Sequence, residues 1–184
     1  MEKKALAINP AAGLYSNLGT LYFFEGHYSD AVPPMEKAVE MDAERLDFWG
    51  NLGDAYRWAD GWQERAPQAY QRAVELSRRQ LAMNPRDATL RSGLAEYLAK
   101  MADRTKALAE ITQARRLAPN DSTVLYRAAM VYEIIGLRDQ ALSTLDLALQ
   151  GGYSIDELHH DPEFSELRKD PRFEQMEKAS APQR

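Results

Sequence analysis

Three adjacent residues near the C-terminal end, His159, His160 and Asp161, have side chains that could bind a metal ion. Imidazole and carboxylate groups are common ligands of zinc and related ions. Adjacent residues point in different directions in any regular structure, so these three do not easily converge on one ion. No further histidine or carboxylate cluster accompanies them, and the chain has no cysteine. We therefore expect no metal site and no cofactor.

Catalytic motifs are also missing from the sequence. It contains no glycine-rich phosphate loop, no H-R-D or D-F-G motif, no G-x-S-x-G and no H-E-x-x-H. The acidic residues are spread along predicted helices with the spacing of a solvated surface. The sequence therefore predicts no enzyme, although a parent protein could carry a kinase domain outside this chain.

Composition limits the classes of partner. The net charge of −5 leaves no basic field, which argues against nucleic acid. No apolar run reaches the roughly 18 residues that a transmembrane helix needs. The residues from Met1 to Leu6 lack the apolar core of a signal peptide. We expect no membrane contact and a cytoplasmic location; an extracytoplasmic one stays open if a parent protein spans a membrane.

One frame of aromatic, leucine, glycine and aromatic residues occurs twice, 34 residues apart. It is occupied by Tyr15, Leu18, Gly19 and Tyr22, and again by Trp49, Leu52, Gly53 and Tyr56. The second aromatic follows the first by two helical turns, so both lie on one helix face. The first ring would fill the space between two antiparallel helices, and the glycine would let their backbones approach. We therefore expect Trp49 to lie in the core.

This frame and its period resemble the tetratricopeptide repeat (TPR). The resemblance implies an all-α fold, a right-handed superhelical α-solenoid of stacked antiparallel helix pairs. The expected parts are a remnant second helix of a truncated repeat at 1–11, repeats at 12–45, 46–87, 88–121 and 122–155, capping helices at 156–176, and a disordered tail at 177–184. Because residues 3–10 look like the end of a helix, we expect a fragment that begins inside a repeat.

The second repeat departs from the period, because its second helix continues to Pro85. Ala73 precedes Pro85 by 12 residues, whereas Ala114 precedes Pro119 by 5. Seven extra residues rotate a helix face by only about 20°, so they lengthen the helix without turning its buried stripe. The extension contains Leu76, Leu81 and Met83.

Capping signals predict several helix boundaries. Ser29 is suited to cap the second helix of the first repeat, and Pro33 and Pro34 would distort its first turn. Two Asp-Pro pairs, Asp161-Pro162 and Asp170-Pro171, predict the starts of two short helices. Their apolar residues would cover the face that the last repeat exposes.

A narrower resemblance combines the long helix ending at 78–88 with the closing stretch 152–173, which contains both Asp-Pro pairs. Together they resemble the C-terminal TPR region of bacterial eukaryotic-like serine/threonine kinases and related winged-helix regulators. The resemblance implies a sensor or docking part of a larger signalling protein.

In TPR proteins the first helix of each pair lines a concave groove that often holds an extended peptide or a partner helix. Carried over by position, the candidate groove-binding residues are Asn17, Thr20, Phe24, Asn51, Asp54, Arg57, Trp58, Glu96, Lys100, Tyr126, Arg127 and Glu133. This mixture suits a peptide with apolar anchors flanked by charges of both signs. Of the five side chains that clamp a C-terminal carboxylate in some TPR proteins, only Asn51 is present, so we expect no such clamp.

Several alternatives remain open at this point. Two roles are open for Asn17 and Asn51, which share one place in successive helices: successive hydrogen bonds to a peptide backbone, or a structural role. Trp58 and Trp62 would anchor a partner or pack between helices, and packing is favoured. We expect a non-catalytic protein-interaction module. The alternative is self-association as a homodimer, through the extended helix of the second repeat or the open N-terminal half-repeat.

Overall fold

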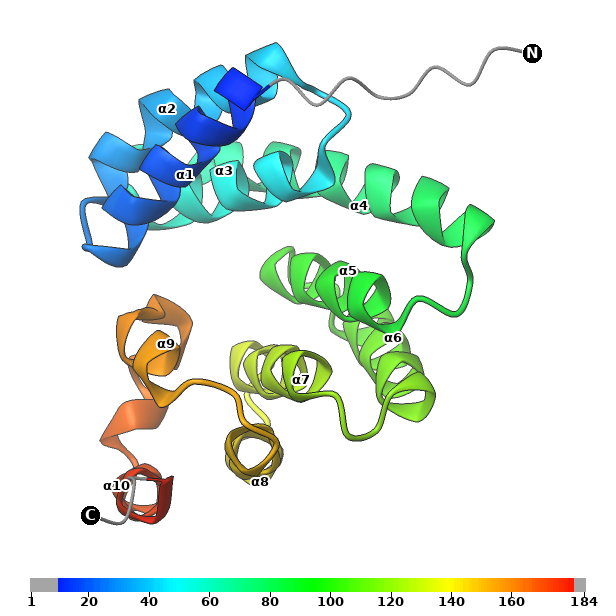
Figure 1. Cartoon of the computed structure of the whole chain (residues 1–184), viewed down its shortest axis with the longest axis vertical. Helices are drawn as coiled ribbons and strands as arrows, with labels where there is room; N and C mark the ends of the chain where they lie inside the picture. The colour runs from blue at the N-terminus through cyan, green and yellow to red at the C-terminus, as the bar shows by residue number, and fades with distance from the viewer. Residues whose placement is uncertain (1–9, 181–184) are drawn as a thin grey trace. The chain divides into compact units, whose positions relative to one another are not determined.

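The computed structural model describes residues 10–180 and divides the chain into two compact units, Met1–Leu76 (unit 1) and Ser77–Arg184 (unit 2) (Figure 1). The described residues form helices joined by short turns, with no strand among them, so the all-α prediction is confirmed. Residues 1–9 of the predicted remnant helix (1–11) lie outside the described part, and Pro10 and Ala11 belong to the first described helix. Of the predicted disordered tail (177–184), residues 177–180 are helical instead, and residues 181–184 lie outside the described part. None of the described helices combines the length and the apolar character needed to cross a membrane.

Unit 1 is built from paired helices. Its elements are α1 (Pro10–Phe24), α2 (Tyr28–Met41), α3 (Leu46–Trp58), the 3-10 turn η1 (Gln63–Arg65) and the first part of α4 (Ala66–Met83). Figure 1 shows α1 and α2 side by side, and α2 also packs against α3. The tight turn between α1 and α2 contains Gly26 at a φ of 79°, a conformation that glycine adopts without steric cost.

The two glycines of the repeat frame lie where paired helices of unit 1 approach each other closely. A Cβ atom on Gly19 would lie 2.5 Å from the Met35 Cγ of α2. A Cβ atom on Gly53 would lie 2.5 Å from the Tyr70 Cε1 of α4. Both distances are far below ordinary contact, so any larger residue would push the paired helices apart. The predicted role of the frame glycines is confirmed.

The start of α2 differs from the prediction. The helix begins at Tyr28, its N-cap is His27, and no side chain caps it, so the predicted Ser29 cap is wrong. The Tyr28 ring packs edge-on against Phe23 with 5.1 Å between ring centres, and this contact places residue 28 at the turn. The two prolines therefore lie in the second turn of α2, beyond the first-turn positions that tolerate proline best.

Helix α4 has 18 residues, the longest in the described chain, and it runs from unit 1 into unit 2. Within the predicted extension, Leu76 and Leu81 are buried, whereas Met83 is 80% exposed. Met83 follows Leu81 by two residues and so points to the other side of the helix. The lengthening of this helix is as predicted, and it leaves one large apolar side chain in solvent.

Unit 2 continues the pairing with α5 (Ala88–Lys100) against α6 (Arg104–Leu117) and α7 (Ser122–Ile134) against α8 (Arg138–Gln150). Three of these helices begin at an aspartate whose carboxylate accepts a backbone N–H three residues on: Asp87, Asp103 and Asp121. Such caps typically stabilise a helix by about 1 kcal/mol. Helix α8 ends at Gly151 and Gly152, the latter at a φ of 88°, as the sequence predicts.

The C-terminal part of unit 2 consists of short helical pieces. They are α9 (Ile155–His160), η2 (Pro162–Phe164), η3 (Leu167–Lys169) and α10 (Pro171–Ser180). The two Asp-Pro pairs act as predicted, because Asp161 and Asp170 accept backbone N–H groups two residues on. Phe164 and Leu167 are fully buried, so these pieces are packed into the apolar core of the unit.

Candidate functional site

The predicted groove residues of unit 1 come from α1 and α3. The Asn51 Nδ2 donates to the Ser16 Oγ at 3.4 Å, which joins the two helices. The Thr20 hydroxyl donates back to the Ser16 carbonyl oxygen at 2.9 Å. Asn17 is exposed. The two asparagines therefore differ in surroundings: Asn51 lies between helices, and Asn17 faces solvent.

The remaining candidates of unit 1 are partly engaged. Asp54 accepts the Tyr70 hydroxyl at 2.6 Å, a bond between α3 and α4. Trp58 lies half-buried against Tyr28, with 5.9 Å between ring centres, and Arg57 is also half-buried. Phe24 is 44% exposed at the end of α1. Packing between helices thus accounts for Trp58, while Phe24 keeps an exposed apolar surface.

The other two tryptophans also serve packing, but not where the frame predicts. Trp62 stacks on Tyr56 with 5.6 Å between ring centres, and the Arg65 guanidinium lies 4.6 Å over the Trp62 ring. Trp49 is only half-buried and donates its Nε1–H to the Ala43 carbonyl at 2.9 Å, so its predicted core position is wrong. Phe48 is buried instead, on the α3 helix that packs against α2.

In unit 2 the candidate residues of α5 and α7 form a buried ionic cluster. The Lys100 Nζ lies 2.7 Å from the Glu96 Oε1, and the Lys100 side chain is only 3% exposed. The Arg127 Nε lies 3.7 Å from the Glu96 Oε2, and its Nη1 donates to the Thr89 carbonyl at 2.9 Å. Burial acts to raise the pKa of Glu96, but Lys100 and Arg127 outweigh it and hold that pKa below its usual range. The cluster ties the two helices together.

The C-terminal segment lies directly on Tyr126, another groove candidate of α7. The Tyr126 hydroxyl donates to the Asp161 carboxylate, and the Tyr126 ring stacks on Tyr153 with 4.1 Å between ring centres. Burial is the main reason that the pKa values of Tyr126 and Asp161 are both raised. The sequence did not predict that Tyr153 and Asp161 lie next to this groove position. Tyr126 and Asp161 are 35 positions apart, too far for the periodicity of one helix to relate them.

Glu133, the last candidate, is also paired inside unit 2. Its two carboxylate oxygens accept from the Arg138 Nη2 at 2.6 Å and the Arg138 Nε at 2.7 Å, a bidentate pair between the end of α7 and the start of α8. The five candidates of unit 2 are therefore held in contacts within that unit, whereas those of unit 1 include exposed side chains.

An apolar surface on α1 was not among the predicted sites. Five of the seven exposed large hydrophobic residues in the described chain lie on this helix: Leu14, Tyr15, Leu18, Leu21 and Phe24. Tyr15, the first ring of the frame, was expected to fill the space between helices but is 40% exposed, so that expectation is wrong for the first repeat. Leu18 of the same frame is 41% exposed. The corresponding Leu52 is only 3% exposed, because α3 packs against the preceding helix α2.

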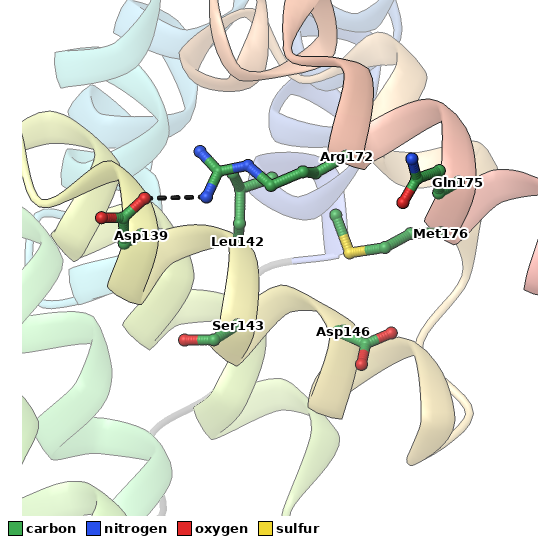
Figure 2. Close-up of a pocket in the computed structure, with 7 residues that line it drawn as sticks. All are labelled: Asp139, Leu142, Ser143, Asp146, Arg172, Gln175 and Met176. Carbon is green, nitrogen blue, oxygen red and sulfur yellow. Dashed lines mark hydrogen bonds and ion pairs between the residues drawn. The ribbon is translucent and has the colours of Figure 1, made fainter.

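A hollow of about 400 Å³ lies between α8 and α10 (Figure 2). Its lining residues are Asp139, Leu142, Ser143, Asp146, Arg172, Gln175 and Met176. The Arg172 Nη1 lies 2.8 Å from the Asp139 Oδ1 and its Nη2 lies 2.7 Å from the Asp170 Oδ2. The first pair joins α8 to α10, and the second links Arg172 to the residue just before α10.

The residues considered as metal ligands have separate partners. The His159 Nε2 lies 3.0 Å from the Glu177 Oε1, and the His160 Nδ1 lies 2.8 Å from the Asp156 carbonyl oxygen. Asp161 accepts from Tyr126, as described above. Within residues 10–180, no three His, Asp or Glu side chains are placed to hold a metal ion.

Comparison with known proteins agrees with the fold of paired helices. Residues 12–45 and 46–80 each match the tetratricopeptide repeat family model. These two stretches, within residues 12–80, therefore have the TPR pattern. The second match ends inside α4, so the last residues of that helix lie beyond the repeat.

A thermophilic TPR protein of Thermus thermophilus has 24% sequence identity, with 84% of this chain and 81% of that protein covered and a TM-score of 0.54. This likeness supports the fold of stacked TPR helix pairs. PilF of Pseudomonas aeruginosa has 21% identity, 94% and 74% coverage and a TM-score of 0.49. MamA of Desulfovibrio magneticus RS-1 has 16% identity, 95% and 92% coverage and a TM-score of 0.44. Scores this low bear on neither fold nor function. None of the curated protein sequences compared with the chain matches it.

Proposed function

We propose that the chain is a non-catalytic protein-interaction module that holds a peptide or helix of a partner protein along α1 and α3 of unit 1. The observation that supports this most is the contrast between the units. On unit 1, Asn17 and Phe24 are exposed, and Asn51 and Arg57 are partly exposed. The matching side of unit 2 is used for ion pairs and for contacts with the C-terminal segment.

The chemistry of unit 1 fits an extended peptide. An asparagine amide offers one acceptor and two donor hydrogens, so Asn17 can bond a peptide backbone. Phe24 offers an aromatic surface of the kind that anchors partners at interfaces. Arg57 and Asp54 on α3 add charge of both signs. Thr20 and Trp58 complete this side as supports, since they bond and pack within the unit.

The candidates of unit 2 have a different place in this proposal. Glu96, Lys100, Tyr126, Arg127 and Glu133 would keep α5, α7 and the C-terminal segment rigid, and a partner would meet only their exposed edges. The long α4 and the two Asp-Pro pairs are the features that resemble TPR regions of bacterial signalling proteins. On that resemblance we propose that the module serves as a docking part of such a protein.

A double substitution tests the proposed face. Asn17→Ala with Phe24→Ala removes two exposed side chains, so the helical content should stay at the wild-type value. Partners captured from the native lysate by the wild-type chain would be identified by mass spectrometry, and their binding segment titrated by calorimetry. We expect at least tenfold weaker binding by the double variant, equal to about 1.4 kcal/mol.

The matched control is Leu147→Ala, which alters a side chain of unit 2 that is 46% exposed. It should bind like the wild type. Equal affinity of the double variant and the wild type would refute the α1–α3 face as the binding site.

A further inference from the structure

Helix α1 carries a row of leucines on its outer side. Leu14, Leu18 and Leu21 follow one another at spacings of four and three residues and so share one helix face. They are 69%, 41% and 54% exposed, and we call them the leucine stripe. Tyr15 and Phe24 flank it with 40% and 44% of their surface exposed. Exposed apolar patches on a soluble protein commonly mark interaction sites.

The same positions in the next repeat indicate what kind of element covers such a row. Phe48, Leu52 and Ala55 follow the stripe leucines by 34 residues and are 3%, 3% and 0% exposed. They are buried because α3 packs against α2, and the hydroxyl of Tyr56 on that side of α3 donates to Glu36 of α2 at 2.6 Å. In the second repeat, these positions are covered by a helix of unit 1. The leucine stripe is the equivalent surface of the first repeat.

The pattern of the stripe favours a second copy of the same helix. Leu18 lies near its middle, with Leu14 before it and Leu21 after it. In an antiparallel pair around a twofold axis, Leu18 meets the same residue of the second copy, and Leu14 meets the second copy's Leu21. A twofold interface requires this self-complementarity.

Charge agrees with this pairing. Residues 10–24, the whole of α1, contain no Asp, Glu, Lys or Arg. No like charges therefore face each other along the paired helices, and no charge on α1 selects a partner of opposite sign. We propose that α1 packs antiparallel against α1 of a second copy through the leucine stripe and makes the chain a dimer.

The area of the leucine stripe together with its flanking rings, Tyr15 and Phe24, sets the strength of this dimer. Five side chains with 40% to 69% of their surface exposed offer on the order of 500 Å² per copy. Two copies then bury on the order of 1,000 Å², at the low end of specific interfaces. We expect a reversible dimer that dissociates on dilution.

Sedimentation velocity of the full chain over a wide concentration range tests the dimer. The wild type should shift from monomer to dimer as concentration rises. Leu18→Glu places a carboxylate at the centre of the stripe and should raise the dissociation constant at least tenfold. Leu147→Glu alters a leucine of unit 2 with 46% exposure and should leave the constant unchanged. Because Leu18 is 41% exposed, the charge should not prevent folding, which circular dichroism checks.

Cysteine cross-linking tests the register of the pair. The chain has no native cysteine, so a single introduced thiol reports on its own position. Leu18→Cys should form a disulfide-linked dimer under mild oxidation, because the two residues meet at the axis. Leu147→Cys should cross-link at least tenfold more slowly, by random collision.

Three results would overturn the proposal. A wild-type monomer at all concentrations excludes the dimer. A dimer that forms only after deletion of residues 1–9 shows that the chain's own N-terminal segment covers the stripe. Equal cross-linking at positions 18 and 147 shows that no defined α1 pairing exists. Phe24 flanks the stripe and also belongs to the proposed partner face, so partner binding is measured at concentrations where the chain is monomeric. Failure of the dimer is then distinguishable from failure of partner binding.

Discussion

The two units use the corresponding sides of their first helices in opposite ways. On unit 1 the side formed by α1 and α3 keeps Asn17 and Phe24 in solvent. On unit 2 the side formed by α5 and α7 holds Lys100 with only 3% of its side chain exposed, and Asp161 of the C-terminal segment is bonded to Tyr126. The same repeat positions thus serve recognition, as proposed, in one unit and internal cohesion in the other.

Position in a repeat therefore does not decide whether a residue is available to a partner. A buried lysine and glutamate are costly to desolvate, and they are retained only with close pairing. Once they are paired inside unit 2, binding a partner there would require breaking that pairing. An exposed amide such as Asn17 has no comparable cost to overcome.

The tryptophans allow the two units to be followed separately. All three, Trp49, Trp58 and Trp62, lie in unit 1, and unit 2 has none. Tryptophan emission therefore reports the unfolding of unit 1, while far-ultraviolet circular dichroism reports the helices of both units. The comparison of the units can be tested by substitutions that act on one signal and not on the other.

The largest effect is expected from Lys100→Met in unit 2. The substitution leaves the Glu96 carboxylate buried without its closest cation, which typically costs about 3–5 kcal/mol. Urea unfolding should show the helical signal of unit 2 lost at lower denaturant, with the tryptophan transition of unit 1 unchanged. As a control, Asn51→Ala removes one 3.4 Å hydrogen bond and should cost about 0.5 kcal/mol. A urea midpoint of unit 2 that is the same in Lys100→Met and the wild type would contradict the role of the ionic cluster in holding α5 and α7 together.

A smaller effect, confined to unit 1, is expected from Gly53→Ala. The new methyl group would lie 2.5 Å from the buried Tyr70 ring, and such overpacking costs about 1–3 kcal/mol, partly offset by better helix propensity. The tryptophan transition should shift to lower urea. Gly13→Ala, where a Cβ meets no atom within 4 Å, should instead stabilise α1 by about 0.5–1 kcal/mol. Equal shifts for the two variants would rule out close packing as the cause.

The smallest effect concerns pH and Asp161. Burial raises the pKa of this carboxyl above 3.8, although Tyr126 and Lys100 act to lower it. The folded state therefore holds the proton more tightly, and this contribution to stability is complete below the ordinary pKa and lost as pH rises through the raised one. Asp161→Asn stays neutral and avoids that loss.

As pH rises from below the ordinary pKa through the raised one, the stability difference between Asp161→Asn and the wild type should move in favour of the variant. Urea unfolding followed by circular dichroism at several pH values measures it. Taking the difference between the two proteins removes the contribution of Asp103 and Asp170, whose pKa values are lowered by their hydrogen bonds and act in the opposite direction. A constant difference across this range would show that burial does not govern Asp161.

Much of the fold was accessible from local sequence patterns. The frame around Gly19 and Gly53 predicted the paired helices, since a glycine at the same position of both repeats reports a close helix approach. The seven-residue surplus before Pro85 predicted the long α4, and the Asp-Pro pairs predicted two helix starts. These features depend on residues within a few turns of each other.

Local patterns in the chain were enough to locate the helices and the glycines that bring them together, because backbone hydrogen bonds and side-chain periodicity are local properties. Three features came only with the packing of helices: Phe48 is buried in place of Trp49, Asp161 is bonded to Tyr126, and Leu18 is exposed while Leu52 is not. Burial depends on which neighbouring helix stacks on a face, and no spacing within the helix itself contains that information.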